Sequence, residues 1–553
     1  MSAQLLLREF ERIGDAPNGI MRLRGFILDL AVRGKLLHQQ PEDRPATAIL
    51  TEIAAHERLP VTSPIAASDP PFEAPLGWQW ARVSHLAHIE MGQSPPSESY
   101  NQSGNGVPFY QGKADFGLLN PTPRYWCTAP TKMAGAADIL ISVRAPVGPT
   151  NVATGDCCIG RGLTALRPYT GVEADYLLLV LRAFESDLAA LGFGTTFVAI
   201  KKSQLATFCL PLPPLAEQHR IVAKVDELMA LCDQLEAAQK ERELHRDALR
   251  VVSLHRLTTA PEDAPAPDDV KFFLHKSPRF IKAPEHLAEL RQTILDLAVS
   301  GRLLPQNPSD EPATALVRRI ELSDGGVLSR ARRPAPSPDR QVPEDTLPVG
   351  WVRVAVSHVF RVTGGIQKQP KRTPVKNAFP YLGVSNVQRG RLELERVGRF
   401  ELFAGELEKL RLEVGDLLVV EGNGSANEIG RCARWNGEII NCVHQNHIIR
   451  CRALHEGLER FTLLYLNSPA GTATMRRLAI TSAGLYSLSV GKIQRITIPL
   501  PPLEEQHRIV ARVDELMMIC DQLEEALTSA KFERGRLLEA LLRDSLSGAG
   551  FAT

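Results

Sequence analysis

Two segments of the chain repeat one pattern of hydrophobic and polar positions almost residue for residue. Residues 211–236 read PLPPLAEQHRIVAKVDELMALCDQLE and residues 499–524 read PLPPLEEQHRIVARVDELMMICDQLE, with 22 of 26 positions identical. Apolar residues recur in both at spacings of three and four, which is typical of one face of an α-helix. The first copy places Ile221, Val225, Leu228, Cys232 and Leu235 on this face, and the second places Ile509, Val513, Leu516, Cys520 and Leu523.

Each repeat predicts a long helix that begins after a pair of prolines. Proline fits a first turn, where a missing N–H is tolerated, and Glu217 and Glu505 follow where a negative charge suits the helix dipole. A helix of roughly 40 residues would be about 60 Å long at ~1.5 Å per residue, which favours a coiled coil over an ordinary amphipathic helix on a globular core. We expect the two copies to bury their apolar faces against each other, in antiparallel orientation.

Shorter repeats precede each long helix. The run ILDLAVRGKLL followed by PATAIL in residues 27–50 returns as ILDLAVSGRLL and PATALV in residues 294–317, and PLGW at 75–78 returns as PVGW at 348–351. Residues 79–200 and 352–488 align only loosely and mix short strand-like runs with helical runs. Duplication without functional meaning does not explain why only these stretches diverged. We therefore expect the repeated parts to do one job twice and the diverged parts to do two different jobs.

This pattern predicts an α+β chain in which two α/β domains in tandem are joined by a pseudo-two-fold pair of long helices forming an antiparallel coiled coil. A length of 553 residues allows three to four structural units at about 150 residues each. The expected order is an N-terminal helical segment and connector (1–70), a first α/β domain (71–210), a first long helix (211–257), a linker (258–284), a repeat of the N-terminal helical segment (285–325), a Pro-rich linker (326–346), a second α/β domain (347–498) and a second long helix (499–547).

Composition narrows the class of protein. Lys and Arg number 64 and Asp and Glu 63, so the net charge of +1 excludes a strongly basic tail-type nucleic-acid binder, but a local basic face would still suffice for DNA. Nine cysteines without paired CxxC spacing argue against a disulfide scaffold and a zinc site. The charged start MSAQLLLREFER lacks a signal-peptide core, and no apolar run reaches the ~18 residues of a membrane span, so we expect a cytoplasmic protein.

Motifs for catalysis are weak. The tetrapeptide DPPF at 69–72 resembles the one with which amino-methyltransferases hold the target amino group, but no Gly-rich cofactor loop precedes it. A Walker A loop is absent, and the repeated His219 and His507 fit a capping or interface role better than catalysis. We therefore expect no catalytic residue, no metal site and no cofactor bound by this chain.

Charge and polarity in the diverged stretches favour DNA contact. Residues 361–400 hold nine Lys or Arg against Glu393 and Glu395, which favours phosphate contact over a merely solvated face. Residues 91–106 form a polar loop whose amides and hydroxyls suit base edges, although by composition it is simply a loop. The predicted DNA-binding residues are Gln93, Ser94, Ser97, Tyr100, Lys113, Arg144, Arg161, Lys201, Lys202, Gln367, Lys368, Lys371, Arg372, Asn386, Arg389, Arg391, Asn423 and Tyr486.

The doubled PLPPLxEQHRIVxxVDELMxxCDQLE, the two PxGW entries, GRGL at 160–163 with LRP at 166–168, and QNHIIR at 445–450 together carry a specific resemblance over nearly the whole chain. The chain resembles the DNA-specificity subunit of type I restriction-modification enzymes. That resemblance implies two target-recognition domains that each read half of a bipartite site on double-stranded DNA, and a coiled coil that spaces them.

The same resemblance implies two docked methyltransferase subunits and, optionally, two restriction and translocase subunits. S-adenosylmethionine, ATP and Mg²⁺ would be used by those partners, which would methylate adenine N6 or cut unmethylated DNA. Two other classes stay open at this point. A stand-alone enzyme would need a cofactor or metal motif, and an orphan DNA-binding regulator would lack the methyltransferase partners.

Overall fold

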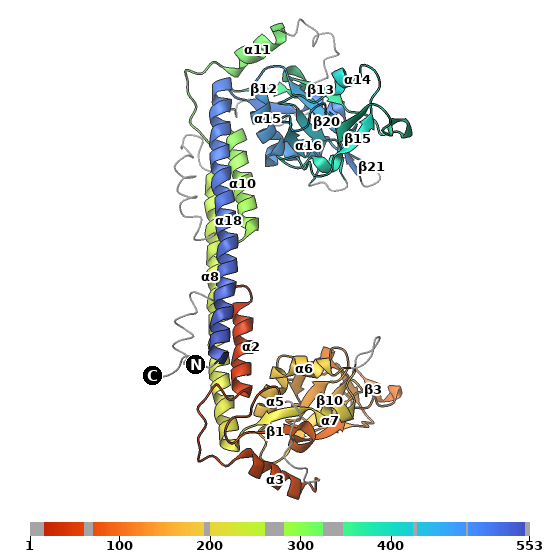
Figure 1. Cartoon of the computed structure of the whole chain (residues 1–553), viewed down its shortest axis with the longest axis vertical. Coiled ribbons are helices and arrows are strands. Elements are labelled where there is room, and N and C mark those ends of the chain that lie inside the picture. The colour runs from red at the N-terminus through yellow and green to blue at the C-terminus, as the bar shows by residue number, and fades with distance from the viewer. Residues whose placement is uncertain are drawn as a thin grey trace. The chain divides into compact units, whose positions relative to one another are not determined.

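The computed structural model of the chain describes residues 16–59, 70–192, 199–259, 281–323, 347–423, 428–482 and 485–547. It divides into two compact units, residues 1–242 with 530–553 (unit 1) and residues 243–529 (unit 2). Two 45-residue helices belong to both: α8 (Leu215–Thr259) begins in unit 1 and ends in unit 2, whereas α18 (Leu503–Ser547) begins in unit 2 and ends in unit 1 (Figure 1). The two long helices therefore run in opposite directions, as predicted.

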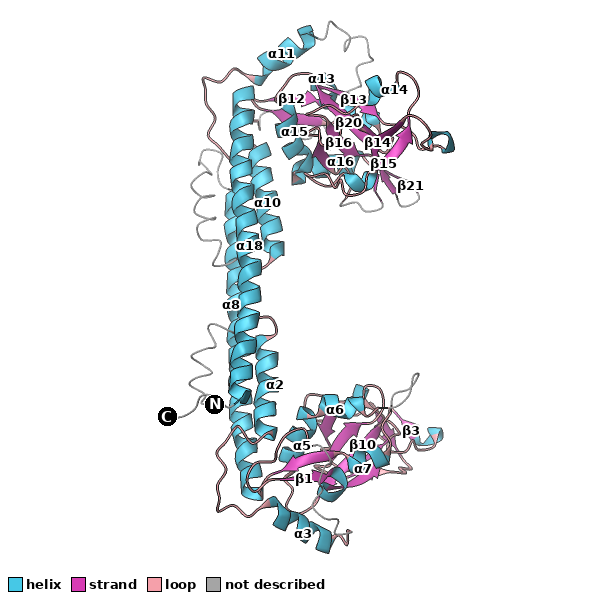
Figure 2. Cartoon of the chain, viewed as in Figure 1, coloured by secondary structure: helices cyan, strands magenta, loops and turns pink. Residues whose placement is uncertain are grey.

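Unit 1 combines helices with a layered α/β domain (Figure 2). Its central sheet has the order β2-β10-β7-β8, an outer sheet has the order β3-β5-β4-β9-β6, and β1 pairs with β11. Helix α5 packs between the central sheet and α2. The elements are α2 (Gly19–Val32), α3 (Ala46–His56), β1 (Gln79–Arg82), α4 (Val83–Leu86), β2 (Ala87–Met91), η1 (Ser97–Ser99), β3 (Tyr100–Asn101), β4 (Val107–Tyr110), η2 (Lys113–Asp115), β5 (Tyr125–Cys127), β6 (Met133–Ala134), β7 (Ile139–Ser142), β8 (Thr150–Val152), β9 (Cys157–Ile159), β10 (Leu163–Pro168), α5 (Ala174–Ala183), α6 (Glu185–Ala190), α7 (Lys202–Thr207) and β11 (Cys209–Leu212).

Unit 2 has the same layers. Its central sheet has the order β13-β20-β16-β18, β14 joins β15 and β19 in the outer sheet, and β12 pairs with β23. Helix α15 packs between the central sheet and α10. The elements are α10 (Pro284–Val299), α11 (Ala313–Ser323), β12 (Val352–Ala355), α13 (Val356–Val359), β13 (Phe360–Gly364), η5 (Pro370–Arg372), β14 (Ala378–Leu382), η6 (Val384–Asn386), β15 (Gly398–Glu401), α14 (Glu406–Leu410), β16 (Leu417–Val420), β17 (Gly422–Asn423), β18 (Cys432–Arg434), β19 (Val443–His444), β20 (Ile448–Ala453), α15 (Leu458–Asn467), α16 (Pro469–Leu478), β21 (Ile480–Ser482), β22 (Leu485–Ser487), α17 (Val490–Arg495) and β23 (Thr497–Leu500).

The strand registers show that the loosely aligned stretches share one topology. Trp80 of β1 faces Pro211 of β11, and Arg353 of β12 faces Pro499 of β23. In each outer sheet a single parallel pairing, β4 with β9 and β14 with β19, lies among antiparallel ones. The predicted fold class of two tandem α/β domains joined by long antiparallel helices is confirmed.

The expectation that the two repeated apolar faces bury each other is wrong. Each is covered by the shorter helix that precedes it in its own half, α2 or α10. The periodicity identified an apolar face but not its partner, and the repeated ILDLAV helices supply the nearest apolar surface. Thus Ile221, Val225, Leu228, Cys232 and, at the margin, Leu235 join a core with Leu23, Phe26, Ile27 and Leu30, whereas Ile509, Val513, Leu516, Cys520 and Leu523 join one with Leu287, Leu290 and Ile294.

The far end of each long helix joins the other unit's helices through residues beyond the repeated block. In unit 2, Leu254 of α8 packs against the core that α10 and α18 form. In unit 1, Leu538 of α18 is fully buried in a cluster with Ala16, and Arg22 of α2 lies 4.0 Å from Glu539. The described helical layer in each unit therefore contains segments of both long helices and one short helix.

A repeated polar junction connects each α/β domain to its long helix. The indole N–H of Trp78 donates to the Glu217 carboxylate at 2.9 Å, and Trp351 donates to Glu505 at 3.0 Å. Gln39 adds a second donor to Glu217. Burial raises the pKa of both Glu217 and Glu505. Since a buried carboxylate without donors is costly, these bonds stabilise the junction.

Candidate nucleic-acid interface

Four segments of the first α/β domain meet at one edge, which we call the first edge (residues 93–94, 143–144, 161–162 and 199–202). Backbone hydrogen bonds join them: Gln93 N–H donates to Ile159 at 3.0 Å, Val143 N–H to Gly162 at 2.9 Å and Ile200 N–H to Val143 at 3.0 Å. An isolated bridge pairs Arg144 with Ala199. Segments more than 100 residues apart in the chain therefore present neighbouring side chains.

Six of the predicted DNA-binding residues lie on the first edge, and most of them are cations. The Arg161 guanidinium donates to the Ser94 hydroxyl at 3.1 Å, so two of these residues contact each other. A cationic edge with a free amide suits phosphate contact beside a base-reading group. Exposed side chains on this edge are those of Gln93, Arg144, Arg161, Lys201 and Lys202, and Ser94 is half-buried.

The other predicted residues of the first domain lie elsewhere. Ser97 and Lys113 are exposed in the short helical turns η1 and η2. Tyr100 packs its ring 5.0 Å from that of Phe109, and its hydroxyl donates to the Pro95 carbonyl at 3.1 Å. These two contacts fix Tyr100 within the polar loop of residues 91–106.

The second α/β domain builds the equivalent edge from equivalent segments, the second edge (residues 366–368, 421–423, 445–447 and 486–488). Asn446 N–H donates to Ile366 at 2.8 Å, Glu421 N–H to His447 at 2.9 Å and Leu488 N–H to Glu421. Strand β17 pairs with β22, which places Asn423 opposite Tyr486. The side chain of Asn423 lies outside the described residues.

The chemistry of the second edge differs from that of the first. It carries Gln367 and Lys368, both exposed, and a Glu421–His447 pair at 3.0 Å. Gln445, Asn446 and His447 were not among the predicted site residues, although the QNH run was visible in the sequence. Behind them, burial lowers the pKa of His444 to about 4, so its neutral ring can donate from Nδ1 to the Ile448 carbonyl at 2.9 Å. This bond supports the turn that presents Asn446.

The basic run of residues 361–400 does not form one patch. Arg372 makes a bidentate pair with Glu406 at 2.8 and 2.9 Å, and this pairing lowers the Glu406 pKa to about 2. Asn386 is buried and donates to the carbonyls of Glu393 and Arg396. Arg389 is half-buried and donates to the Thr472 hydroxyl at 3.1 Å. The structure gives these three predicted DNA-contact residues roles inside the domain, because linear charge does not reveal such internal acceptors.

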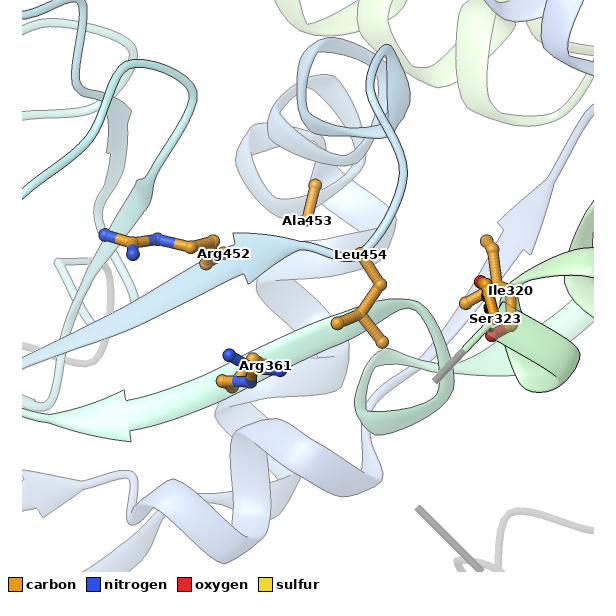
Figure 3. A pocket seen from close by; sticks show the side chains of 6 residues that line it. All are labelled: Ile320, Ser323, Arg361, Arg452, Ala453 and Leu454. Atoms are coloured by element: carbon orange, nitrogen blue, oxygen red, sulfur yellow. Dashed lines mark hydrogen bonds between the residues drawn. The ribbon is translucent and has the colours of Figure 1, made fainter. Parts of the chain in front are cut away.

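Exposed cations of the same run remain near the outer sheet. Lys371 and Lys376 both precede β14, while Arg391 pairs with Glu393 at 3.1 Å on the surface. Arg361 is on β13, across from Arg452 of β20, and both line a cleft of about 330 Å³ beside the end of α11 (Figure 3). Arg452 is neutralised there by Asp416 and Glu413.

Catalytic and metal chemistry find little support in the described residues. No group of three or more His, Cys, Asp and Glu in these ranges could hold a metal ion. All nine cysteines are free, and burial raises the pKa of Cys157, Cys442 and Cys451 to about 12. No helix in the described ranges is long and apolar enough to cross a membrane. Asp69 lies outside the described residues, but Phe72 of the DPPF run packs 4.9 Å from Trp80.

Each edge lies within a region that matches a known sequence family. The profile described as type I restriction modification DNA specificity domain matches residues 75–246 and again residues 348–530, so it covers both halves of the chain. The chain belongs to the type I restriction-modification specificity family. It is accordingly a specificity subunit, a non-catalytic component of such an enzyme that recognises a DNA target sequence.

Relatives of this specificity family match over different lengths. The EcoEI specificity subunit of Escherichia coli is 26% identical over 96% of this chain and 94% of its own. The putative MjaX specificity subunit of Methanocaldococcus jannaschii is 41% identical over 31% of this chain and 40% of its own. The crystal structure of the HsdS subunit from Thermoanaerobacter tengcongensis shares 43% identity over 40% of this chain and 48% of its own, with a TM-score of 0.29.

Proposed function

We propose that the two α/β domains are target-recognition domains that each read one half of a bipartite site on double-stranded DNA. The observation that carries this proposal is the pair of edges: one topology, assembled from equivalent segments, with different side chains. Sequence is read by polar groups at base edges, whereas phosphate contacts fix register. The first edge, with Arg144, Arg161 and Lys201, would rely more on cations, and the second, with Gln367 and Asn446, more on amides.

The repeated helical block would dock two methyltransferase subunits, one on each copy. Outside its buried face the block keeps identical exposed residues, although their contacts within the chain differ between the copies: His219 pairs with Glu173 in the first, and Asp514 pairs with Arg460 in the second. An exposed surface that is preserved twice supports one kind of partner bound twice. The identical exposed polar pairs are His219 and His507, Asp226 and Asp514, Glu227 and Glu515, Asp233 and Asp521, and Gln234 and Gln522.

Counting bound subunits tests this docking proposal. The double change Asp226→Lys with Glu227→Lys should reduce the number of methyltransferase subunits per chain from two to one, as measured by mass photometry. Adding Asp514→Lys and Glu515→Lys should reduce it to zero. Glu241→Lys is the matched control, because Glu241 is exposed on α8 beyond the repeated block. Two bound subunits in the fourfold variant would contradict the docking surface.

The partners would supply the chemistry. Methyltransferase subunits would use S-adenosylmethionine to methylate adenine N6, and two restriction subunits would use ATP and Mg²⁺ to translocate and cut unmethylated DNA. Reaching an amino group inside the duplex requires that the base be flipped out of the stack. The complex would work in the cytoplasm, on the cell's own and on foreign DNA.

An orphan DNA-binding regulator is the alternative function. It would share the two edges but would have no use for the preserved exposed surface on α8 and α18. Co-purification of the chain with a methyltransferase encoded beside it separates the two, since a regulator would purify alone and bind its DNA without that subunit.

A further inference from the structure

A polar cleft of about 570 Å³ lies in unit 2 between α10 and α16, with β12 and β23 beneath. Three arginines line it, Arg302, Arg353 and Arg477, together with a single acidic residue, Asp296. The volume is in the range of ligand sites. The cleft is separate from the second edge, because the two share no residue.

Arg353 is the unusual member of this lining. Its side chain is half-buried, and its Nε atom is buried without a hydrogen-bond partner. Within the described ranges, no ion pair or hydrogen bond reaches its guanidinium. A buried donor without an acceptor is costly, so it calls for an acceptor supplied by a ligand. Asp296 is not the acceptor for Arg353, because its carboxylate accepts the Ala470 N–H and burial raises its pKa.

The corresponding place in unit 1 is filled by aromatic rings. Trp80 occupies the strand position of Arg353, since each faces the equivalent proline of the repeat, Pro211 or Pro499. The Trp80 ring lies 4.9 Å from that of Phe72 and 6.2 Å from that of Phe184. A duplicated scaffold has thus kept an apolar plug in one half and an arginine-lined cleft in the other.

We propose that the cleft of unit 2 binds a phosphate group, with Arg353 as the central ligand and Arg302 and Arg477 at its sides. A guanidinium fork matches the spacing of phosphate oxygens and can donate two parallel hydrogen bonds. A phosphate of the DNA backbone and one of a soluble compound present the same chemistry. Only the DNA source rests on the proposed function, and the experiment separates the two.

The test compares the full-length chain with its Arg353→Gln variant. Melting temperature is measured in inorganic phosphate and in chloride at equal ionic strength, and Arg319→Gln, on the exposed face of α11, is the matched control. Phosphate stabilises many proteins without a site, so the readout is the difference between variants. We expect the phosphate-specific increase to be smaller in Arg353→Gln, and unchanged in Arg319→Gln. Arg477→Gln should also reduce it.

A second arm identifies the source. DNA binding by the chain with its methyltransferase partner is measured against salt concentration, and a lost backbone contact lowers the slope of log K against log salt by about 0.9. A lower slope in Arg353→Gln assigns the cleft to DNA, and an unchanged slope beside a lost phosphate effect assigns it to a soluble phosphate compound. Equal phosphate effects in wild type and Arg353→Gln would overturn the proposal. The proposed function itself fails only if the wild-type complex shows no sequence preference on DNA.

Discussion

The two halves of the chain agree where the α/β domain joins the long helix and differ where the domain faces outward. At the junction, Trp78 with Glu217 and Trp351 with Glu505 have bond lengths within 0.1 Å of each other, at 2.9 and 3.0 Å. Outward, the first domain has a five-stranded outer sheet and a cationic edge, while the second has a three-stranded sheet and an edge with a Glu421–His447 pair. The comparison indicates that attachment was preserved after duplication while the outward surface was free to change.

Replacing one α/β domain should have the largest effect on the recognised DNA site. If residues 348–498 are exchanged for the second domain of another specificity subunit, one half of the recognised site should change completely and the other should stay the same. The exchanged segment contains Trp351, so the new domain should attach if it carries a tryptophan at this position to donate to Glu505. Methylation mapping with the swapped chain measures this, and a change in both halves would show that the domains do not read independently.

Lengthening the helices tests whether they set the distance between half-sites. The chain passes from one unit to the other after Arg242 in α8 and after Ser529 in α18. A heptad inserted at both points adds about 10 Å of helix, which corresponds to roughly three base pairs at ~3.4 Å each. The unspecified spacer of the site should lengthen by about that amount with both half-sites intact.

The control for the spacer is a heptad inserted after Phe532, beyond the repeated block, in α18 alone. It should disturb the packing of α18 beside α2 and should not lengthen the unspecified spacer of the recognised site. If the doubly extended chain folds, supports methylation and recognises the original spacer, the partners and not the helices position the domains.

The junction should respond equally in both halves. Trp351→Phe leaves the buried Glu505 carboxylate short of one donor, which should cost about 1–3 kcal/mol of unfolding free energy, and Trp78→Phe should cost a similar amount at Glu217. Denaturant unfolding, followed with a spectroscopic probe in each unit, measures both losses of unfolding free energy. A large effect in one half alone would mean that the two junctions are not equivalent.

The Glu505 pKa adds a pH signature to this prediction. A raised carboxyl pKa means that the folded state binds the proton more tightly, so this stabilisation is fully present below the ordinary value of 4.5 and is lost as pH rises through the raised pKa. Glu505→Gln keeps an acceptor for Trp351 but cannot ionise. Its stability relative to wild type should therefore improve as pH rises, whereas an unchanged difference would contradict the burial argument.

The smallest expected effects separate surface cations from internal ones. Lys368→Ala and Lys371→Ala should each lower the salt slope of DNA binding by about one unit with little change in stability. Arg372→Ala should leave the slope nearly unchanged and destabilise unit 2, because Glu406 loses its bidentate partner. An equal slope change in all three variants would restore the basic run as one DNA-binding patch.

Much of this architecture could be predicted from the sequence because its strongest signals are local and repeated. The 22 identities between the two blocks and the three-four spacing located both long helices. That spacing could not predict that α2 covers Ile221, because an apolar face does not indicate which surface packs against it. For the site, Arg144 and Arg161 could be identified by their charge. They lie on one edge because the Val143 N–H donates to Gly162, and the sequence does not reveal this backbone hydrogen bond.

Repetition held a further signal for the residues that sequence reasoning missed. Trp78 and Glu217 both recur in the second half, as Trp351 and Glu505, and a pair of polar and aromatic residues kept twice indicates contact. Arg353 gave no such signal, because its equivalent is Trp80 and only the packed structure shows the cleft beside it.

The central claim is that each half of the chain reads its own half-site. Methylation-sensitive sequencing of DNA modified by the chain with its methyltransferase partner tests it most directly. The account predicts a bipartite motif of two short half-sites separated by a fixed unspecified spacer, with methylated adenine in each half. Removing the cations of the first edge with Arg144→Gln and Arg161→Gln should weaken or relax one half-site and leave the other intact. A single uninterrupted motif, or relaxation of both halves together, would contradict the account.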